Sequence, residues 1–154
     1  MGYHSSKIAM SLFARGKKKS RYCELPSKKK NTIQDCVDEI TRAHKTILTN
    51  SKNKDEIQWK DDILSPWVLE YVCDGKERYN DPIDCAAYIM TTIATEHPFF
   101  DGNKRTSYVV TKKYLEGEGL KLSASKDDYE FIRKIATGKV SQREVKKWIK
   151  KRVK

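Results

Sequence analysis

The sequence predicts an all-α fold, and three kinds of observation lead to that expectation. Apolar residues recur at helical spacing, helix-capping residues precede those stretches, and glycine or proline follows them. At 154 residues, with 38% hydrophobic and 34% charged side chains, the chain is long and apolar enough to form one core. We therefore expect a compact helical bundle.

The first predicted helix starts with Thr32 as its N-cap and stops near Asn50. A shorter helix is expected within Leu64–Val72, beginning near its proline. Between them, the polar stretch Ser51–Asp62 has two alternating apolar positions. This pattern fits either an exposed loop or a small β-hairpin, and both alternatives stay open.

The second half of the chain carries the strongest helix signals. An aspartate followed by a proline opens a helix that is apolar almost all round, so it should lie at the centre of the bundle. Two later serines, each followed three residues on by an acid, have the form of a capping box. The predicted helices run from Asp81 to Pro98, from about Asn103 to Glu116, from Ser125 to Gly138, and from Ser141 to the C-terminal region.

The net charge of +11 is concentrated at the two ends of the chain. Residues 1–30 carry +8, residues 143–154 carry +6, and residues 31–142 carry −3. Basic ends are usually solvated, so we expect a flexible basic extension over residues 1–30 and a helical domain over residues 31–154. Nucleic acid, or an acidic partner, would be attracted only weakly and only through these ends.

The apolar and cysteine patterns exclude several classes of protein. The apolar run Cys85–Thr95 is too short to span a bilayer, and the N-terminus lacks the pattern of a secretory signal. A cytoplasmic protein without a membrane partner is therefore expected. The cysteines at positions 23, 36, 73 and 85 form neither a C-x-x-C pair nor a zinc pattern, so we expect reduced thiols that pack as small hydrophobes.

The segment His97–Thr106, between the two strongest helices, combines residues suited to binding an anion. Asn103, Lys104 and Arg105 begin the second helix, where cations oppose the positive end of the helix dipole. A bound anion would resolve that conflict, and phosphate is a common ligand at such a terminus. Gly102 allows a sharp turn and a close approach of the backbone to the ligand.

Two further residues of this segment add the remaining parts of a phosphoryl-transfer site. Asp101 is an acid suited to holding Mg²⁺ between phosphate oxygens. His97 carries an imidazole, the side chain most often used as a general base, and it can accept a proton. A base, a metal ligand and an anion-binding helix start together indicate phosphoryl transfer.

The same segment resembles the signature of the Fic/Doc superfamily, H-x-F-x-[D/E]-G-N-[G/K]-R. The fixed positions are met by His97, Phe99, Asp101, Gly102, Asn103 and Arg105. Weaker likenesses extend the resemblance over roughly residues 31–152. It implies the Fic/Doc helical fold, with Phe99 anchoring the loop in the core and Thr106 packing or capping. His44 is expected to be a packing residue outside the site.

Two positions make the sequence similar to the Doc (death-on-curing) branch. Lys104 and Tyr108 stand where AMP-transferring Fic enzymes carry glycine and a second arginine. The resemblance then implies a toxin-type kinase that moves the γ-phosphate of ATP, with Mg²⁺, to a hydroxyl of a protein such as a translation factor. His97 would be the base, Asp101 the metal ligand, and Gly102, Asn103, Lys104 and Arg105 the phosphate-binding residues.

The resemblance also implies a flap that docks the target by strand addition, and Ser51–Asp62 is the candidate segment. No inhibitory [S/T]-x-x-x-E-[G/N] sequence is complete in the chain, so an antitoxin acting in trans is expected. Two alternatives stay open. One is a Fic-type nucleotidyltransferase that moves AMP or UMP, and the other is an inactive Fic-like binding module.

Overall fold

A computed structural model describes residues 26–154 of the chain, with side chains from residue 33 onward. Within that range the fold is all-α, as predicted, and most of the expected extension over residues 1–30 lies outside the described residues. The helices are α2 (Pro26–Thr49), α3 (Pro66–Gly75), α4 (Pro82–Glu96), α5 (Asn103–Gly117), α6 (Tyr129–Ala136) and α7 (Gln142–Lys150), with 3₁₀ turns η2 (Lys54–Trp59), η3 (Lys76–Arg78) and η4 (Lys126–Asp128).

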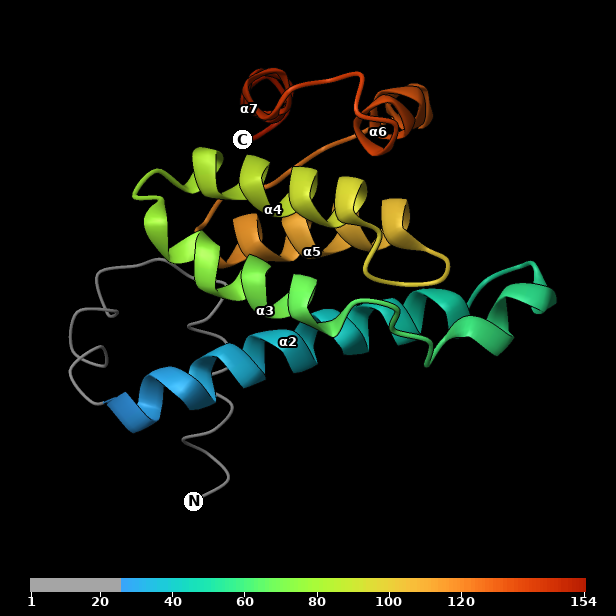
Figure 1. Cartoon of the computed structure of the whole chain (residues 1–154). Coiled ribbons are helices and arrows are strands. Elements are labelled where there is room, and N and C mark those ends of the chain that lie inside the picture. Colours follow the sequence, from blue (N-terminus) through green and yellow to red (C-terminus); the bar gives the residue numbers. More distant parts are fainter. Residues whose placement is uncertain (1–25) are drawn as a thin grey trace.

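The helices form layers around α4, which contacts α3, α5, α6 and α7. Figure 1 shows α4 and α5 in the middle, with α2 and α3 on one side and α6 and α7 on the other. Helix α4 takes the central place because its residues are apolar almost all round, so every face of it gains by burial. The prediction of a central helix at this point is confirmed.

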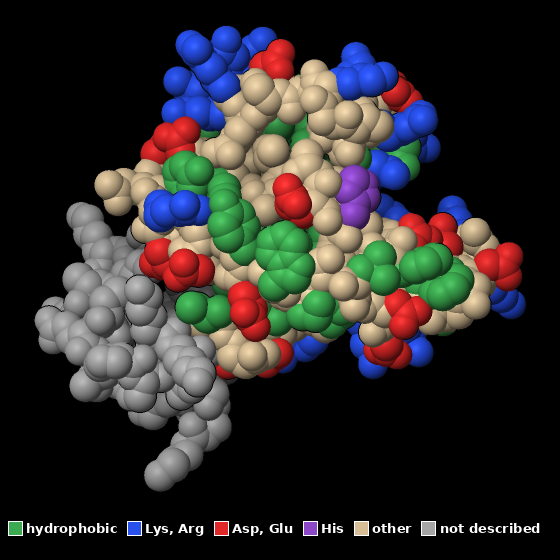
Figure 2. All heavy atoms as spheres, in the orientation of Figure 1, with side chains coloured by type: hydrophobic (Ala, Val, Ile, Leu, Met, Phe, Trp, Pro, Cys, Tyr) green, Lys and Arg blue, Asp and Glu red, His purple; other side chains and the backbone are tan. Residues whose placement is uncertain are grey.

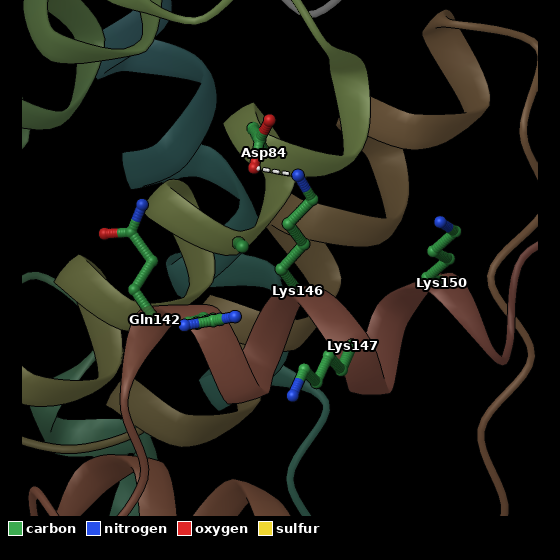
Figure 3. Close-up of a pocket in the computed structure, with 7 residues that line it drawn as sticks. Asp84, Gln142, Lys146, Lys147 and Lys150 are labelled. Atoms are coloured by element: carbon green, nitrogen blue, oxygen red, sulfur yellow. Dashed lines mark ion pairs between the residues drawn. The ribbon is translucent and has the colours of Figure 1, made fainter.

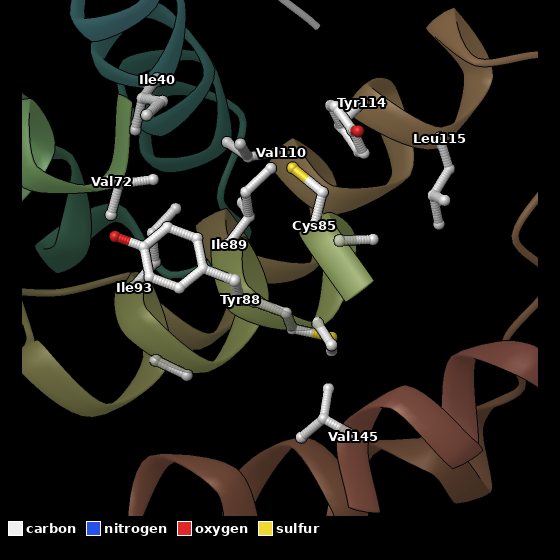
Figure 4. Close-up of a cluster of buried hydrophobic side chains, with 14 of the residues drawn as sticks. Ile40, Val72, Cys85, Tyr88, Ile89, Ile93, Val110, Tyr114, Leu115 and Val145 are labelled. Atoms are coloured by element: carbon white, nitrogen blue, oxygen red, sulfur yellow. The ribbon is translucent and has the colours of Figure 1, made fainter. Parts of the chain in front are cut away.

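The core consists of apolar side chains that all these helices contribute. Figure 4 shows Ile89 and Ile93 of α4 among side chains from α2, α3, α5 and α7. Each is at most 1% exposed. Burying a side chain of this size is worth about 1.5–3 kcal/mol, so the core supplies the rigid frame on which the connecting turns are held.

Local caps fix the starts of the helices where the sequence predicts them. The Asp81 side chain accepts a hydrogen bond of 3.1 Å from the Ile83 N–H at the start of α4. Ser141 and Glu144 form a capping box at α7. Ser125 and Asp128 form another, although it opens the 3₁₀ turn η4, and α6 follows directly.

One prediction of local structure is wrong, and the two alternatives left open for Ser51–Asp62 are decided in favour of the loop. Helix α2 begins at Pro26 rather than at Thr32, because proline suits a first helical turn and no helix-breaking residue lies between the two positions. Ser51–Asp62 is not a hairpin. It folds as a loop around η2, capped by Asn53, and the described residues contain isolated bridges but no strand.

The cysteine prediction is also wrong for one pair. Cys36 of α2 and Cys73 of α3 form a disulfide, with a Cα–Cα distance of 6.0 Å. The two helices pack side by side and bring these thiols together across 37 residues of sequence, which no local spacing pattern reveals. Cys85 keeps a buried, reduced thiol, as predicted, and Cys23 lies outside the described residues.

Charge and apolar side chains are unevenly distributed over the surface. Figure 2 shows Lys and Arg gathered mainly over α6 and α7, while hydrophobic and acidic side chains alternate over α3. The most exposed large hydrophobic side chains in the described range include Leu64, Trp67 and Tyr71. From residue 26 onward, no helix combines the length and the apolar character that crossing a membrane requires.

Candidate active site

The segment His97–Thr106 forms the turn between α4 and α5, and we call it the motif turn. It begins at His97, which ends α4 with a left-handed φ of 50°. It enters α5 through Gly102, whose φ is 79°. The positive φ favours glycine here, and a Cβ at Gly102 would also lie 2.9 Å from Leu48 Cδ2, so that this side chain would have to shift.

Asn103 and Phe99 hold the motif turn in place. The Asn103 side chain is 8% exposed, donates to the Phe99 carbonyl at 2.8 Å, and accepts from the Phe99 N–H at 2.9 Å. The Phe99 ring is 1% exposed and stacks on His44 at a centroid distance of 3.8 Å. Phe99 therefore anchors the loop in the core, as predicted.

His44 supports the motif turn from beneath. Its side chain is fully buried, and its Nε2 lies 2.7 Å from the Asp101 carbonyl oxygen. A carbonyl only accepts, so Nε2 carries the proton. Burial lowers the pKa of His44 below its ordinary value, which keeps the ring neutral at physiological pH. The expectation that His44 is a packing residue is confirmed.

His97, by contrast, is exposed and oriented by a single local hydrogen bond. Its Nδ1 lies 2.7 Å from the Thr95 carbonyl oxygen. Because that oxygen can only accept, the proton of the neutral ring is on Nδ1 and the lone pair is on Nε2. The local backbone thus prepares Nε2 to take up a proton.

The start of α5 provides backbone donors and two cations. The first N–H groups of a helix have no partner within the helix, so those of Asn103, Lys104 and Arg105 are available to an anion. Lys104 forms no ion pair with any residue in the described range. The Arg105 guanidinium lies 2.9 Å from Glu56 Oε2 and 3.9 Å from Asp101 Oδ1.

Glu56 belongs to η2, and its carboxylate is fixed in this position by two neighbours. Ser51 Oγ donates to Glu56 Oε2 at 2.5 Å, and Arg105 contacts the same oxygen. The hydrogen bond from Ser51, followed by the contacts of Arg105, lowers the pKa of Glu56. Glu56 therefore carries a negative charge beside the backbone N–H groups and cations at the start of α5.

Asp101 is the residue of the motif turn whose carboxylate could hold a metal ion together with a substrate. Its carboxylate is 41% exposed, and its contacts with Gly102 N and Arg105 both use Oδ1. Residues 26–154 contain no group of three or more His, Cys, Asp or Glu side chains that would hold a metal alone. Mg²⁺ is usually bound by one or two carboxylates together with substrate phosphates, so a single accessible carboxylate fits that ion.

The segment Ser51–Asp62 packs directly against the motif turn. The Trp59 ring stacks on Phe100 at a centroid distance of 3.9 Å. The Phe100 N–H donates to the Asp62 carbonyl at 3.2 Å, and Ile63 and Phe99 form an isolated bridge. Ser51–Asp62 therefore lies in contact with the motif turn, although the segment contains no strand.

The predicted site residues meet at one turn, but they differ in what their side chains do. His97, Asp101, Lys104 and Arg105 are at least partly accessible, whereas the Asn103 side chain is used inside the protein. Only the backbone of Asn103 is thus offered to an anion. Thr106 is fully buried, which agrees with a packing role. Glu56 was missed, because no spacing rule connects it with Arg105.

A cleft of about 430 Å³ between α4 and α7 lies apart from this turn, since no residue of the motif turn lines it. Figure 3 shows Lys146 reaching across it to Asp84, at 2.7 Å. The Lys146 ammonium is also 3.8 Å from Asp81. The acidic side chains of Asp81 and Asp84 thus offset part of the basic charge in this cleft.

Comparison with known proteins agrees with the geometry of the motif turn. No curated protein sequence matches the chain. A sequence model of the Fic/DOC family, however, matches residues 35–115. That range holds His44, the disulfide, η2, the motif turn and nearly all of α5. Because the match spans more than half of the chain and includes every residue of the turn, this protein belongs to the Fic/DOC family.

Proposed function

We propose that this protein is a Doc-like phosphotransferase that moves the γ-phosphate of ATP to a hydroxyl side chain of a target protein. Fic/DOC proteins are typically protein-modifying transferases. The observation that carries the proposal is the position of His97. Its hydrogen bond to Thr95 leaves Nε2 to act as a base, beside a helix N-terminus that carries Lys104, a residue without an ion pair in the described range 33–154.

His97 would start the reaction. Nε2 takes the proton from the target hydroxyl as the hydroxyl oxygen attacks the γ-phosphorus. The new P–O bond forms while the bond between the γ-phosphorus and the β,γ-bridging oxygen breaks, so ADP leaves with that electron pair. The proton stays on His97 until it passes to solvent, which its exposure allows.

The start of α5 would stabilise the transferring phosphate. Backbone N–H groups of Asn103 to Arg105 and the Lys104 ammonium neutralise charge on the phosphate oxygens. Asp101 would hold Mg²⁺, and the bound ion would neutralise negative charge on the phosphates. Arg105 must exchange its contact with Glu56 for phosphate. Both partners are partly exposed, so that exchange costs little.

Lys104 is the residue that favours phosphate transfer over the alternatives. Lys104 adds a cation where AMP-transferring Fic enzymes carry glycine. Tyr108 stands where those enzymes carry a second arginine, so the helix lacks that second cation. An inactive binding module would not require an oriented His97 beside an accessible Asp101. Nucleotidyl transfer and inactivity remain as outcomes of the test.

The decisive experiment supplies the protein and a cell lysate with ATP labelled on either the α- or the γ-phosphate. We expect label on a target only from the γ-position, and a mass increase of one phosphate on the modified peptide. Lys104→Gly should lose most of this transfer, while Lys113→Gly, on an exposed part of α5, is the matched control. Label from the α-position in the native protein would establish nucleotidyl transfer instead.

We further propose that an antitoxin inhibits the enzyme in trans and that the enzyme acts in the cytoplasm on a translation factor. ATP and translation factors are cytoplasmic, which supports that location. The Cys36–Cys73 disulfide argues against it, since such bonds are rare in the cytosol. Trapping of free thiols in freshly lysed cells tests the point: a blocked pair would place the protein in an oxidising compartment.

A further inference from the structure

The cleft between α4 and α7 is lined on its α7 side by basic side chains. The four cations of this lining are Arg143, Lys146, Lys147 and Lys150. Lys146 is engaged with Asp84, and Figure 3 shows Lys147 and Lys150 extending from α7 without reaching that carboxylate. Arg143, Lys147 and Lys150 are exposed, and none of them forms an ion pair with the residues whose side chains the structure describes. We call these three residues the basic row.

Helix α7 holds the basic row at a fixed spacing because its opposite face is buried. Val145, Trp148 and Ile149 are at most 6% exposed and belong to the core. The capping box fixes the first turn of the helix. At 1.5 Å per residue, the first and last members of the row are about 10 Å apart along the helix axis. The row is therefore a straight, rigid array of cations.

The stability of α7 does not account for the basic row. Lys147 and Lys150 lie in the last turn, where a cation is favoured by the helix dipole, but Arg143 lies in the first turn, where a cation opposes it. Arg143 and Lys147 are four residues apart, and Lys147 and Lys150 are three apart. Like charges at these spacings repel one another and destabilise a helix. An anion bound along the row would remove that repulsion.

The surroundings of the cleft reinforce its positive potential. Residues 126–154 contain eleven Lys or Arg and four Asp or Glu, whereas residues 33–125 carry a net charge of −4. Three of those four acids are already occupied: Asp128 and Glu130 pair with arginines, and Glu144 caps α7. Figure 2 shows the resulting concentration of basic side chains over α6 and α7. A surface of this kind attracts polyanions over a distance.

The lining of the cleft favours a nucleic acid over an acidic protein. Ala87 is its one apolar residue among those described, and it contains no aromatic side chain. Protein interfaces are usually centred on large apolar or aromatic anchors, whereas interfaces with nucleic acids are more polar and much more positively charged. A nucleic-acid strand in a duplex carries one phosphate about every 3.4 Å of its axis, so a row of about 10 Å spans about three phosphates.

We propose that the α4–α7 cleft binds the phosphodiester backbone of a nucleic acid, with Arg143, Lys147 and Lys150 contacting successive phosphates. Because phosphate contacts carry no sequence information, binding is independent of base sequence. RNA and DNA share this backbone chemistry, and the experiment below distinguishes them. No residue of the cleft belongs to the motif turn, so the inference does not depend on the proposed phosphotransferase function.

The test measures binding of the full chain to labelled single strands of RNA and DNA with the same sequence. Strands of about 20 nucleotides are titrated by fluorescence anisotropy at salt concentrations of about 50–200 mM. The combined variant Arg143→Gln, Lys147→Gln, Lys150→Gln should bind about 10- to 100-fold more weakly near 0.1 M salt. The slope of log affinity against log salt should decrease by about 2, since each phosphate contact on a single strand contributes about 0.7.

A matched control removes three positive charges outside the cleft. The combined variant Lys52→Gln, Lys113→Gln, Lys121→Gln changes exposed residues and should bind nearly as the native chain does. Basic residues 1–30 are retained in both variants, so their contribution cancels in the comparison. Lys147→Arg with Lys150→Arg keeps the charge and should keep the affinity. Circular dichroism checks that every variant is folded.

The outcomes decide the proposal in both directions. Equal weakening by the cleft variant and the control variant would show diffuse attraction without a site, and would overturn it. Poly-glutamate that binds as tightly as RNA of the same charge would assign the cleft to an acidic protein instead. Lysine acetylation mapped by mass spectrometry locates the contact: bound nucleic acid should protect Lys147 and Lys150, and protection only at other lysines would contradict the proposal.

Discussion

The motif turn and the segment Ser51–Asp62 lie in contact but are built in opposite ways. The motif turn is anchored by buried groups, Phe99 and Asn103, and presents its reactive side chains outward. The segment around η2 has no buried residue and reaches the turn through partly exposed groups, Trp59 and Glu56. One region therefore has its geometry fixed by the core, and the other is held by surface contacts.

The two regions match two different requirements of the proposed transferase. Groups that carry out the chemistry need a fixed geometry, because a small displacement costs much of the rate. Groups that admit a substrate need contacts that are cheap to exchange, and surface ion pairs are worth little. The predictions below test whether the two regions divide these tasks, starting with the largest expected effect.

Replacing the proposed base, His97, should remove most of the proposed transfer activity and leave the fold intact. We expect His97→Ala to reduce phosphate transfer by about 10²- to 10⁴-fold, the usual contribution of a general base. Transfer is followed with γ-labelled ATP, and thermal unfolding is followed by circular dichroism. Glu96→Ala, at the exposed neighbouring position, is the control and should keep full activity. Native turnover in His97→Ala would remove this residue from the mechanism.

Reducing the disulfide should destabilise the frame of the Ser51–Asp62 segment. The Cys36–Cys73 bond closes a loop of 37 residues that contains this segment but not the motif turn. A loop of that length predicts a loss of about 4 kcal/mol in the free energy of unfolding. Urea unfolding with and without a phosphine reductant measures it, and Cys85→Ala should respond to the reductant as the native chain does. Coincident curves would show that the bond contributes no stability.

Removing the internal anchor should destabilise the motif turn itself. Asn103→Ala leaves the Phe99 N–H and carbonyl without their partners in a buried position. We expect a loss of about 2–4 kcal/mol in unfolding free energy. ATP binding should also weaken, because the turn that leads into the phosphate-binding start of α5 loses its support. Asn80→Ala, at an exposed site, is the control. Surface substitutions typically change the free energy of unfolding by less than about 0.5 kcal/mol. A change that small would show that the turn does not depend on this anchor.

The smallest effect is expected at Glu56. Glu56→Gln removes the charge that pairs with Arg105, so phosphate no longer competes with a carboxylate. ATP should bind about 2- to 5-fold more tightly, with unfolding free energy changed by less than about 1 kcal/mol. Calorimetry measures the affinity, with Glu70→Gln on the exposed face of α3 as the control. Unchanged or weaker binding would show that Glu56 does not restrain Arg105.

The same division explains which features could be predicted from the sequence. Helix starts such as Asp81 and Ser141 were predictable because capping depends on a few adjacent residues. The motif turn was predictable because its residues are consecutive. The contact between Glu56 and Arg105 depends on how distant segments pack, and no local pattern encodes it.

Two errors have a common origin in local signals that the fold overrides. Thr32 has a side chain suited to an N-cap, but the preceding lysines continue the helix, so α2 begins at Pro26. Cys36 and Cys73 lack any disulfide spacing, but adjacent helices bring them into contact. Of the candidate site, the sequence indicated which residues gather at the turn. It did not indicate that the Asn103 side chain faces inward.

The backbone conformation of His97 implies that the protein is less stable than it could be, in favour of the proposed activity. Among the described residues it is the one non-glycine with a positive φ, a conformation that costs of the order of 1–3 kcal/mol. Glycine would adopt that conformation without strain, although its greater freedom in the unfolded chain offsets part of the gain. His97→Gly should therefore melt no lower than the native protein while transferring nothing. Selection for stability alone would favour replacement of this residue, so a histidine here is what the proposed role of His97 as the base requires.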